Sequence, residues 1–115
     1  KLIVVFGCGG NRDKYKRPLM GRSVSCFADF AVVTNDNPRY EEPTAIVADI
    51  KPGLTCNYKV VLNRAQATKE ALDMARRGDT GAILGKGAEI YQEIKGKRIY
   101  YNDAEVVARL TTPQR

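Results

Sequence analysis

The chain has 115 residues, 43% of them hydrophobic and 28% charged, which suits one globular domain, residues 1–115, with a buried core. It contains no histidine and three scattered cysteines, so it supplies no Cys-His or Ser-His catalytic pair, and the pattern argues against a disulfide framework or a structural zinc site. The net charge of +6 leaves two kinds of partner open, nucleic acid and phosphorylated or carboxylated small molecules.

Neither a membrane span nor a secretion leader is expected. No apolar run approaches the roughly 20 residues that cross a bilayer, and no basic-then-apolar leader is present. The chain begins directly with a strand-like run and without an initiator methionine. We therefore expect a piece excised from a longer protein rather than a processed one.

A strand, a glycine loop and a helix open the chain. The β-branched and aromatic run Leu2–Phe6 predicts a strand buried on both faces. The following Gly7-Cys-Gly-Gly10 permits backbone conformations that are closed to other residues. Pro18 then opens a helix to about Ala28. Its expected inward residues, at helical spacing, are Leu19, Met20, Val24 and Phe27.

The second strand is expected over Phe30–Thr34. Glu41-Glu42-Pro43 begins a helix, with acidic residues where the helix dipole favours them, and Pro52-Gly53 ends it. A third strand is expected over Lys59–Leu62.

Asn63 has the pattern of an N-cap, with Gln66 three residues later. Its helix is expected to run to about Arg77, with two arginines at the negative end of the dipole and Gly78 closing it. Thr80–Leu84 follows as the fourth strand.

The last part of the chain is expected to start with a polar loop or short turn at Ala88–Gly96. Arg98–Tyr101 alternates as a short strand at an edge. Asn102 and Glu105 form a capping box for the final helix.

Strands alternating with helices predict an α/β fold, a Rossmann-like three-layer sandwich. Its sheet is mainly parallel with helices on both faces, and an antiparallel strand lies at the edge. Right-handed crossovers place the strand-end loops on one rim. These loops are residues 7–16, 34–40 and 85–92.

The turn Asp36-Asn-Pro-Arg39 follows a buried strand, where side chains of an open α/β sheet face the ligand crevice. An arginine fork held there suits a carboxylate or phosphate, because it bonds two oxygens at once. The alternative is a polar loop with a surface arginine. If Arg39 binds a carboxylate, Glu89 could hold an ammonium group beside it, which matches both halves of a zwitterion.

The two glycine loops carry weaker signals. Residues 7–13 match neither a P-loop nor a dinucleotide fingerprint, because the lysine-hydroxyl pair and the third glycine are missing. Gly85-Lys-Gly87 could bring backbone N–H groups close to an anion.

Three stretches together resemble the C-terminal domain of a Mur ligase, closest to the member that adds the third amino acid of the peptidoglycan stem. The stretches are Val5-Phe-Gly-Cys-Gly-Gly-Asn-Arg-Asp-Lys-Tyr-Lys-Arg-Pro-Leu-Met-Gly21, Thr34-Asn-Asp-Asn-Pro-Arg39 with Glu42-Pro43, and Gly85-Lys-Gly-Ala-Glu-Ile-Tyr-Gln-Glu93. They lie in the family's order and spacing, and the similarity covers nearly the whole chain.

The resemblance implies an ATP-dependent amide ligase. ATP phosphorylates the free carboxylate of UDP-MurNAc-L-Ala-D-Glu, and the amine of the incoming amino acid attacks the acyl phosphate. ATP and Mg²⁺ are expected to bind mainly to a central domain that these residues do not contain, so we expect the chain alone to fold without catalysing. The resemblance also implies a cytoplasmic location, without nucleic-acid or membrane partners.

The resemblance further implies individual roles. Arg12 matches a glycine-loop arginine that contacts a substrate carboxylate, and residues 36–39 match the specificity motif that binds the distal centre of meso-diaminopimelate. The implied substrate-binding residues are Arg12, Asp36, Asn37, Pro38, Arg39, Gly85 and Glu89. The segment near the nucleotide matches Asp13, Lys14 and Lys16. A buried arginine left without a distal carboxylate loses binding energy heavily, so Arg39 favours diaminopimelate or a close analogue such as lanthionine over lysine.

Three positions depart from the family pattern: Asn11 replaces an aspartate, Tyr15 a glycine and Ala88 a histidine. The last two are expected at the pocket rim, where they could alter which diamino acid fits. Two alternatives stay open. One is a ligase domain of the folylpolyglutamate or cyanophycin type, and the other is a non-enzymatic module that binds anions or nucleic acid.

Overall fold

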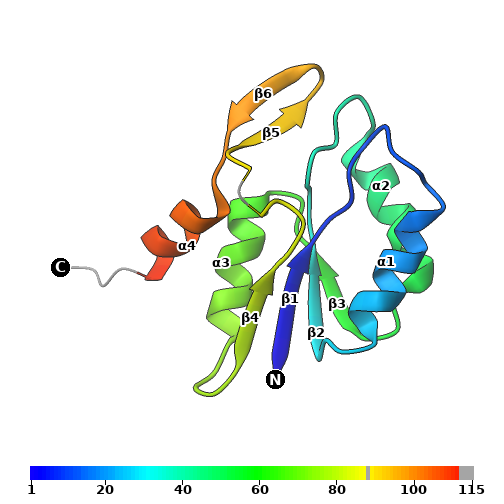
Figure 1. Ribbon diagram of the computed structural model, residues 1–115. Coiled ribbons are helices and arrows are strands. Elements are labelled where there is room, and N and C mark those ends of the chain that lie inside the picture. Colours follow the sequence, from blue (N-terminus) through cyan, green and yellow to red (C-terminus); the bar gives the residue numbers. More distant parts are fainter. Residues whose placement is uncertain (88, 112–115) are drawn as a thin grey trace.

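The computed structural model describes residues 1–87 and 89–111, in which strands and helices alternate (Figure 1). No described helix is long and apolar enough to cross a membrane. In chain order the elements are β1 Leu2–Phe6, α1 Lys16–Ser25, β2 Phe30–Val33, α2 Pro43–Ile50, a 3₁₀ turn Lys51–Gly53, β3 Asn57–Val60, α3 Arg64–Met74, β4 Thr80–Ile83, β5 Tyr91–Ile94, β6 Lys97–Tyr100 and α4 Asp103–Thr111.

Four strands form a parallel sheet in the order β3-β2-β1-β4. In its register, Val4 of β1 lies between Ala31 of β2 and Ala82 of β4. Helices α1 and α2 lie on one side of the sheet and α3 and α4 on the other (Figure 1). The predicted three-layer α/β fold is confirmed.

Both faces of β1 are buried, which explains its continuous apolar run. Val4 and Phe6 pack in the core under α1 and α2, whereas Ile3 and Val5 pack in a second core under α3. These four side chains are at most 3% exposed. The strand therefore anchors the loop that follows it from both sides.

The apolar stripe expected on α1 is wrong. Three of its four residues are 45 to 58% exposed: Leu19, Met20 and Phe27. The buried face consists of Arg17, Gly21 and Val24. A Cβ on Gly21 would lie only 2.7 Å from the carbonyl oxygen of Ile50, so the helix approaches α2 closely through a residue without a side chain.

Two other boundaries differ from the prediction. Helix α3 ends at Met74, before the two arginines, because Ala75 is extended with ψ 135° and Asp79 accepts the backbone N–H of Arg76. Strand β3 begins two residues before the predicted Lys59, because its ladder pairs Asn57 with the first residue of β2.

The first strand of a β-hairpin, β5, lies in a segment expected as a loop, and the second, β6, lies within one residue of the predicted strand. β5 and β6 pair with each other, antiparallel, in a separate two-stranded sheet, so β6 does not extend the main sheet. Lys95 and Gly96 form its turn with φ values of 50° and 78°, which a two-residue turn of this kind requires at both positions.

Candidate functional site

The loops after β1, β2 and β4 meet at one end of the sheet (Figure 1), as parallel strands require. A cleft of about 430 Å³ lies between them and the start of α1. Among its lining residues are five of the predicted site residues: Arg12, Asp13, Lys16, Asp36 and Gly85. Lys14 is exposed and lies outside this lining. The other predicted residues also lie outside it: Asn37, Pro38, Arg39 and Glu89. Arg39 instead lines a smaller pocket of about 200 Å³ together with Glu93 of β5.

The first glycine loop and the Asp36–Arg39 turn are in backbone contact. The N–H of Gly10 donates to the carbonyl oxygen of Asn37 at 2.7 Å. A Cβ on Gly10 would lie 1.8 Å from the carbonyl oxygen of Pro38, and one on Gly9 would lie 2.9 Å from Nη1 of Arg39. None of the glycines in this loop has a positive φ, so here glycine provides space rather than the unusual backbone conformation expected.

Arg39 is held by the hairpin. Its backbone has φ 55°, its N–H donates to the carbonyl oxygen of Glu93 at 2.8 Å, and its own carbonyl accepts from the N–H of Lys95 at 2.7 Å. Its Nε donates to Oε2 of Glu93 at 2.8 Å and its Nη1 to the carbonyl oxygen of Gly10 at 2.9 Å. The β5–β6 hairpin therefore fixes the residue expected to determine specificity. The sequence predicted the strand near β6 but not β5 or its pairing with β6.

Asn37 and Lys86 form a buried polar pair beside Arg39. Asn37 is 4% exposed, and its Oδ1 accepts from Nζ of Lys86 at 2.8 Å and from the N–H of Glu93 at 2.9 Å. Oδ1 of Asp36 lies 3.2 Å from the same Nζ, as an ion pair outside hydrogen-bond geometry. Sequence reasoning treated Lys86 only as part of a glycine turn.

Glu89 completes this network. Its Oε1 accepts from Nδ2 of Asn37 at 3.1 Å and from Nζ of Lys86 at 3.3 Å. Burial opposes the ionisation of Glu89, but these hydrogen bonds outweigh it and keep its pKa below its usual value. Gly85, with φ 109°, turns the chain past Asp36 in a conformation that favours glycine.

Arg17 supports the floor of the cleft, a role with no signal in the sequence beyond a basic cluster. It is 1% exposed. Its guanidinium donates to both carboxylate oxygens of Glu41, to Asp49 at 2.8 Å and to the carbonyl oxygen of Gly9 at 2.9 Å. The hydrogen bonds from Arg17, and then one from the Asn11 backbone, lower the pKa of Glu41 to about 2.

Arg64 connects the loops that follow β2 and β4. It is 2% exposed and makes a two-pronged ion pair with Asp103 of α4, with distances of 2.9 and 2.8 Å. It also donates to the carbonyl oxygens of Asn35 and Leu84, the residues directly before Asp36 and Gly85. One buried guanidinium thus fixes the ends of β2 and β4.

Two of the three residues that depart from the family pattern, Asn11 and Tyr15, lie in the described part of the chain. Asn11 has φ 53°, which asparagine tolerates, and its Oδ1 accepts the N–H of Tyr40 at 3.2 Å. Tyr15 is 86% exposed. Ala88 lies outside the described residues.

Cys8 lines the cleft but is not poised as a nucleophile. Burial raises the pKa of its thiol to about 11, although the nearby Arg17 opposes this. A thiol with so high a pKa carries almost no thiolate at neutral pH.

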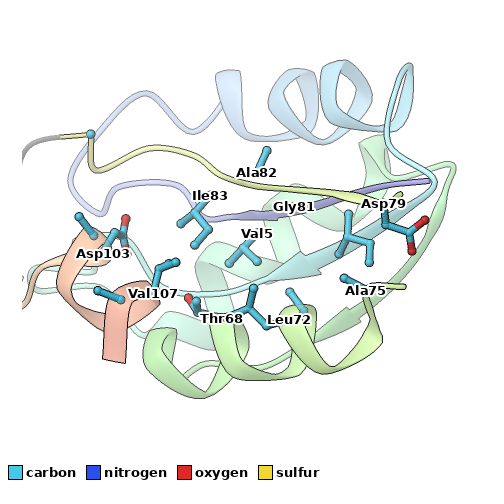
Figure 2. Close-up of a pocket in the computed structure, with 15 residues that line it drawn as sticks. Val5, Thr68, Leu72, Ala75, Asp79, Gly81, Ala82, Ile83, Asp103 and Val107 are labelled. Atoms are coloured by element: carbon cyan, nitrogen blue, oxygen red, sulfur yellow. The ribbon is translucent and has the colours of Figure 1, made fainter. Parts of the chain in front are cut away.

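A larger cavity, of about 640 Å³, lies elsewhere in the fold, between β4, α3 and α4. Figure 2 shows apolar side chains such as Val5, Leu72 and Val107 converging on it. Asp103, at one end, is already paired with Arg64. No residue predicted to bind substrate or nucleotide lines this cavity, so the candidate site is the smaller, charged cleft.

Comparisons with known proteins identify the family of this chain. The family model described as Mur ligase, glutamate ligase domain, matches residues 1–87. The UDP-N-acetylmuramoyl-L-alanyl-D-glutamate–2,6-diaminopimelate ligase of Aquifex aeolicus is 52% identical over 112 residues, and that of Syntrophomonas wolfei is 46% identical over 114. Each alignment covers 96% of this chain and 23% of the relative. The chain thus spans less than a quarter of their length.

A solved structure of a UDP-N-acetylmuramoyl-L-alanyl-D-glutamate–2,6-diaminopimelate ligase superposes with a TM-score of 0.90 at 41% identity. The superposition covers 95% of this chain and 23% of that one. The family match, the relatives and the solved structure are all Mur ligases. The chain therefore belongs to the Mur ligase family, in which it corresponds to the C-terminal domain.

Proposed function

We propose that this chain forms the amino-acid pocket of an ATP-dependent amide ligase in peptidoglycan synthesis. The ligase adds meso-diaminopimelate, or a close analogue such as lanthionine, to UDP-MurNAc-L-Ala-D-Glu. ATP activates the carboxylate of that precursor, and the amine of the amino acid attacks the acyl phosphate. The part of this chain is to bind and orient the amino acid, and the use of a nucleotide-linked precursor and ATP supports a cytoplasmic location.

The proposal rests on a cation, Arg39, and a carboxylate, Glu89, that both form hydrogen bonds with Asn37. Nη1 of Arg39 lies 3.3 Å from the carbonyl oxygen of Asn37, whose Nδ2 donates to Oε1 of Glu89 at 3.1 Å. Within the described part of the chain, Nη2 of Arg39 and Oε2 of Glu89 are left without a hydrogen-bond partner. The distal centre of diaminopimelate carries one carboxylate and one ammonium group, which these two free positions match.

The cleft itself suits an anion. Its lining includes Arg12 and Lys16, and guanidinium and ammonium groups bind carboxylate or phosphate oxygens. Among the described residues, no group of three or more His, Cys, Asp or Glu side chains could hold a metal ion. The proposal therefore assigns Mg²⁺ and most of the ATP contacts to the rest of the ligase, with Asp13, Lys14 and Lys16 on the nucleotide side.

The test is the activity of the full-length ligase on diaminopimelate, lanthionine and lysine, with Arg39→Ala compared with the wild type. We expect kcat/KM for diaminopimelate to fall by about 10²- to 10⁴-fold, because the distal carboxylate loses its partner. Use of lysine, which has no such carboxylate, should change far less. Arg77→Ala, at an exposed arginine away from the cleft, is the matched control.

An unchanged ratio of diaminopimelate to lysine in Arg39→Ala would refute the specificity role. The 115-residue chain alone should release no ADP in the same assay. RNA binding with a steep salt dependence, measured by filter binding, would instead support the nucleic-acid alternative raised by the net charge of +6.

A further inference from the structure

Lys86 is a fully enclosed cation next to the cleft. Its side chain has no exposed area. Its Nζ donates to Oδ1 of Asn37 at 2.8 Å, to the carbonyl oxygen of Tyr91 at 2.8 Å and to Oε1 of Glu89 at 3.3 Å. With Asp36 at 3.2 Å as a further ion-pair partner, the ammonium group is surrounded by protein oxygens. It is therefore not free to bind a ligand.

The contacts of Lys86 determine which way the Asn37 amide faces. Oδ1 accepts two donors, Nζ of Lys86 and the N–H of Glu93. An amide turned by 180° would place its NH₂ group against both of those donors, so the network permits only one orientation. In that orientation Nδ2 points to Glu89 and donates to its Oε1 at 3.1 Å.

Lys86 also balances two carboxylates. Asp36 and Glu89 both lie within 3.3 Å of its Nζ. Without the ammonium group these two acidic side chains would repel each other in a partly buried site, where like charges interact strongly. Arg39, the other cation that lowers the pKa of Glu89, is already paired with Glu93. Lys86 thus holds Glu89 in place and, together with the hydrogen bond from Asn37, favours its ionised form.

We propose that Lys86 is a positioning residue of the amino-acid pocket: without touching the substrate, it fixes the Glu89 carboxylate that binds the distal ammonium group, both directly and through the Asn37 amide that donates to Glu89. This inference rests on the function proposed above. It assigns to Lys86 a role in specificity rather than in catalysis, because its contacts are to Asp36, Asn37 and Glu89 and not to the cleft.

The experiment compares wild-type full-length ligase with Lys86→Met and Lys86→Gln. Methionine keeps the length of the side chain and removes the charge, whereas glutamine restores one donor for Asn37. We expect KM for diaminopimelate to rise about ten- to a hundredfold in Lys86→Met, the effect of an unsatisfied partly buried network. Lys86→Gln should lie between it and the wild type, with kcat and KM for ATP within about twofold of wild type in both. Lys97→Met, at an exposed lysine of β6, is the control.

A pH profile separates positioning from simple loss of structure. The cations near Glu89 are Lys86 and Arg39, and both lower its pKa. Asp36, a carboxylate, shares the ammonium group of Lys86 with Glu89. Removing Lys86 should raise that pKa, so the acidic limb of kcat/KM for diaminopimelate should move to higher pH in Lys86→Met. The limb should stay in place in Lys97→Met.

Three results would overturn the inference: an unchanged KM for diaminopimelate in Lys86→Met, an unmoved acidic limb, or loss of folding in both Lys86 variants, which would make the lysine purely structural. Failure of the proposed function is a different result. In that case the wild-type ligase itself would not use diaminopimelate, whatever residue stands at position 86.

Discussion

Replacing Arg64 by methionine tests whether one buried guanidinium holds the two pocket loops together. Its side chain has no exposed area, and Asp103, its partner, is 11% exposed. Methionine has a similar length and no charge, so it leaves Asp103 without a cation and the carbonyl oxygens of Asn35 and Leu84 without donors. The helix propensity of methionine matches that of arginine, so α3 itself is not weakened.

The expected loss of unfolding free energy in Arg64→Met follows from the burial of the Arg64–Asp103 ion pair. Removing one partner of a buried ion pair typically costs 3–5 kcal/mol, because the other charge stays uncompensated. Some hydration of Asp103 places Arg64→Met at the low end, about 3 kcal/mol. The double variant Arg64→Met/Asp103→Leu removes both charges and should cost less than the single variant. Lys69→Met, which breaks the exposed Lys69–Asp73 pair of the same helix, should lower the free energy of unfolding far less than Arg64→Met, because water screens an exposed pair.

The assay is urea unfolding of the 115-residue chain followed by far-UV circular dichroism, since the chain has no tryptophan. The cost of about 3 kcal/mol is a large fraction of the 5–15 kcal/mol typical of a domain, so the midpoint should shift clearly. The reasoning is refuted if Arg64→Met costs no more than Lys69→Met. It is also refuted if the double variant is less stable than Arg64→Met.

Three further predictions concern the glycine loop and its support. The pKa of Glu41 is lowered to about 2 from 4.5 by its hydrogen bonds with Arg17. Its contribution to the free energy of unfolding is therefore complete above about pH 4.5 and is lost as the pH falls toward 2. The stability of Glu41→Gln, measured by urea unfolding, should depend less steeply on pH in this window, and an unchanged slope would contradict the role of the Glu41–Arg17 pair. Cys8, with a pKa raised to about 11, should resist iodoacetamide at pH 8 while the exposed Cys26 reacts, and mass spectrometry that found Cys8 modified first would count against its burial. Gly10→Ala would place a Cβ 1.8 Å from a backbone oxygen of the Asp36–Arg39 turn, so its melting temperature should fall clearly. The control is Gly78→Ala, where φ is positive but nothing lies within 4 Å of the added Cβ. Equal melting temperatures for the two variants would disprove the clash.

Local sequence determined the framework of this protein. Runs such as Leu2–Phe6 predict strands because every side chain is apolar, and caps such as Asn63 predict helix starts because a short polar side chain satisfies a nearby N–H, here that of Gln66 at 2.9 Å. Alternating strands and helices then require a parallel sheet, and a parallel sheet requires the loops after its strands to share one end. The location of the Asp36–Arg39 turn at the same end of the sheet as the glycine loop therefore follows from the sequence.

The hairpin shows where local reading failed. Tyr91–Ile94 is too polar for an apolar strand pattern, and the Lys95-Gly96 turn gave the only signal for it, a two-residue turn with glycine second. Its stability comes from contacts elsewhere in the chain, including the backbone bonds that Arg39 makes with Glu93 and Lys95. Such contacts have no periodicity that a sequence could display.

The supporting charges were decided by tertiary structure alone. Arg17, Arg64 and Lys86 are ordinary basic residues in the sequence, yet each is at most 3% exposed. Their partners lie far along the chain: Arg64 and Asp103 are 39 residues apart, and Lys86 and Asn37 are 49 apart. A long charged side chain is buried only where the fold supplies carboxylates and carbonyl oxygens around it. The sequence by itself therefore determined that the loops after the strands share one end of the sheet, and only the fold decided which residues hold those loops in place.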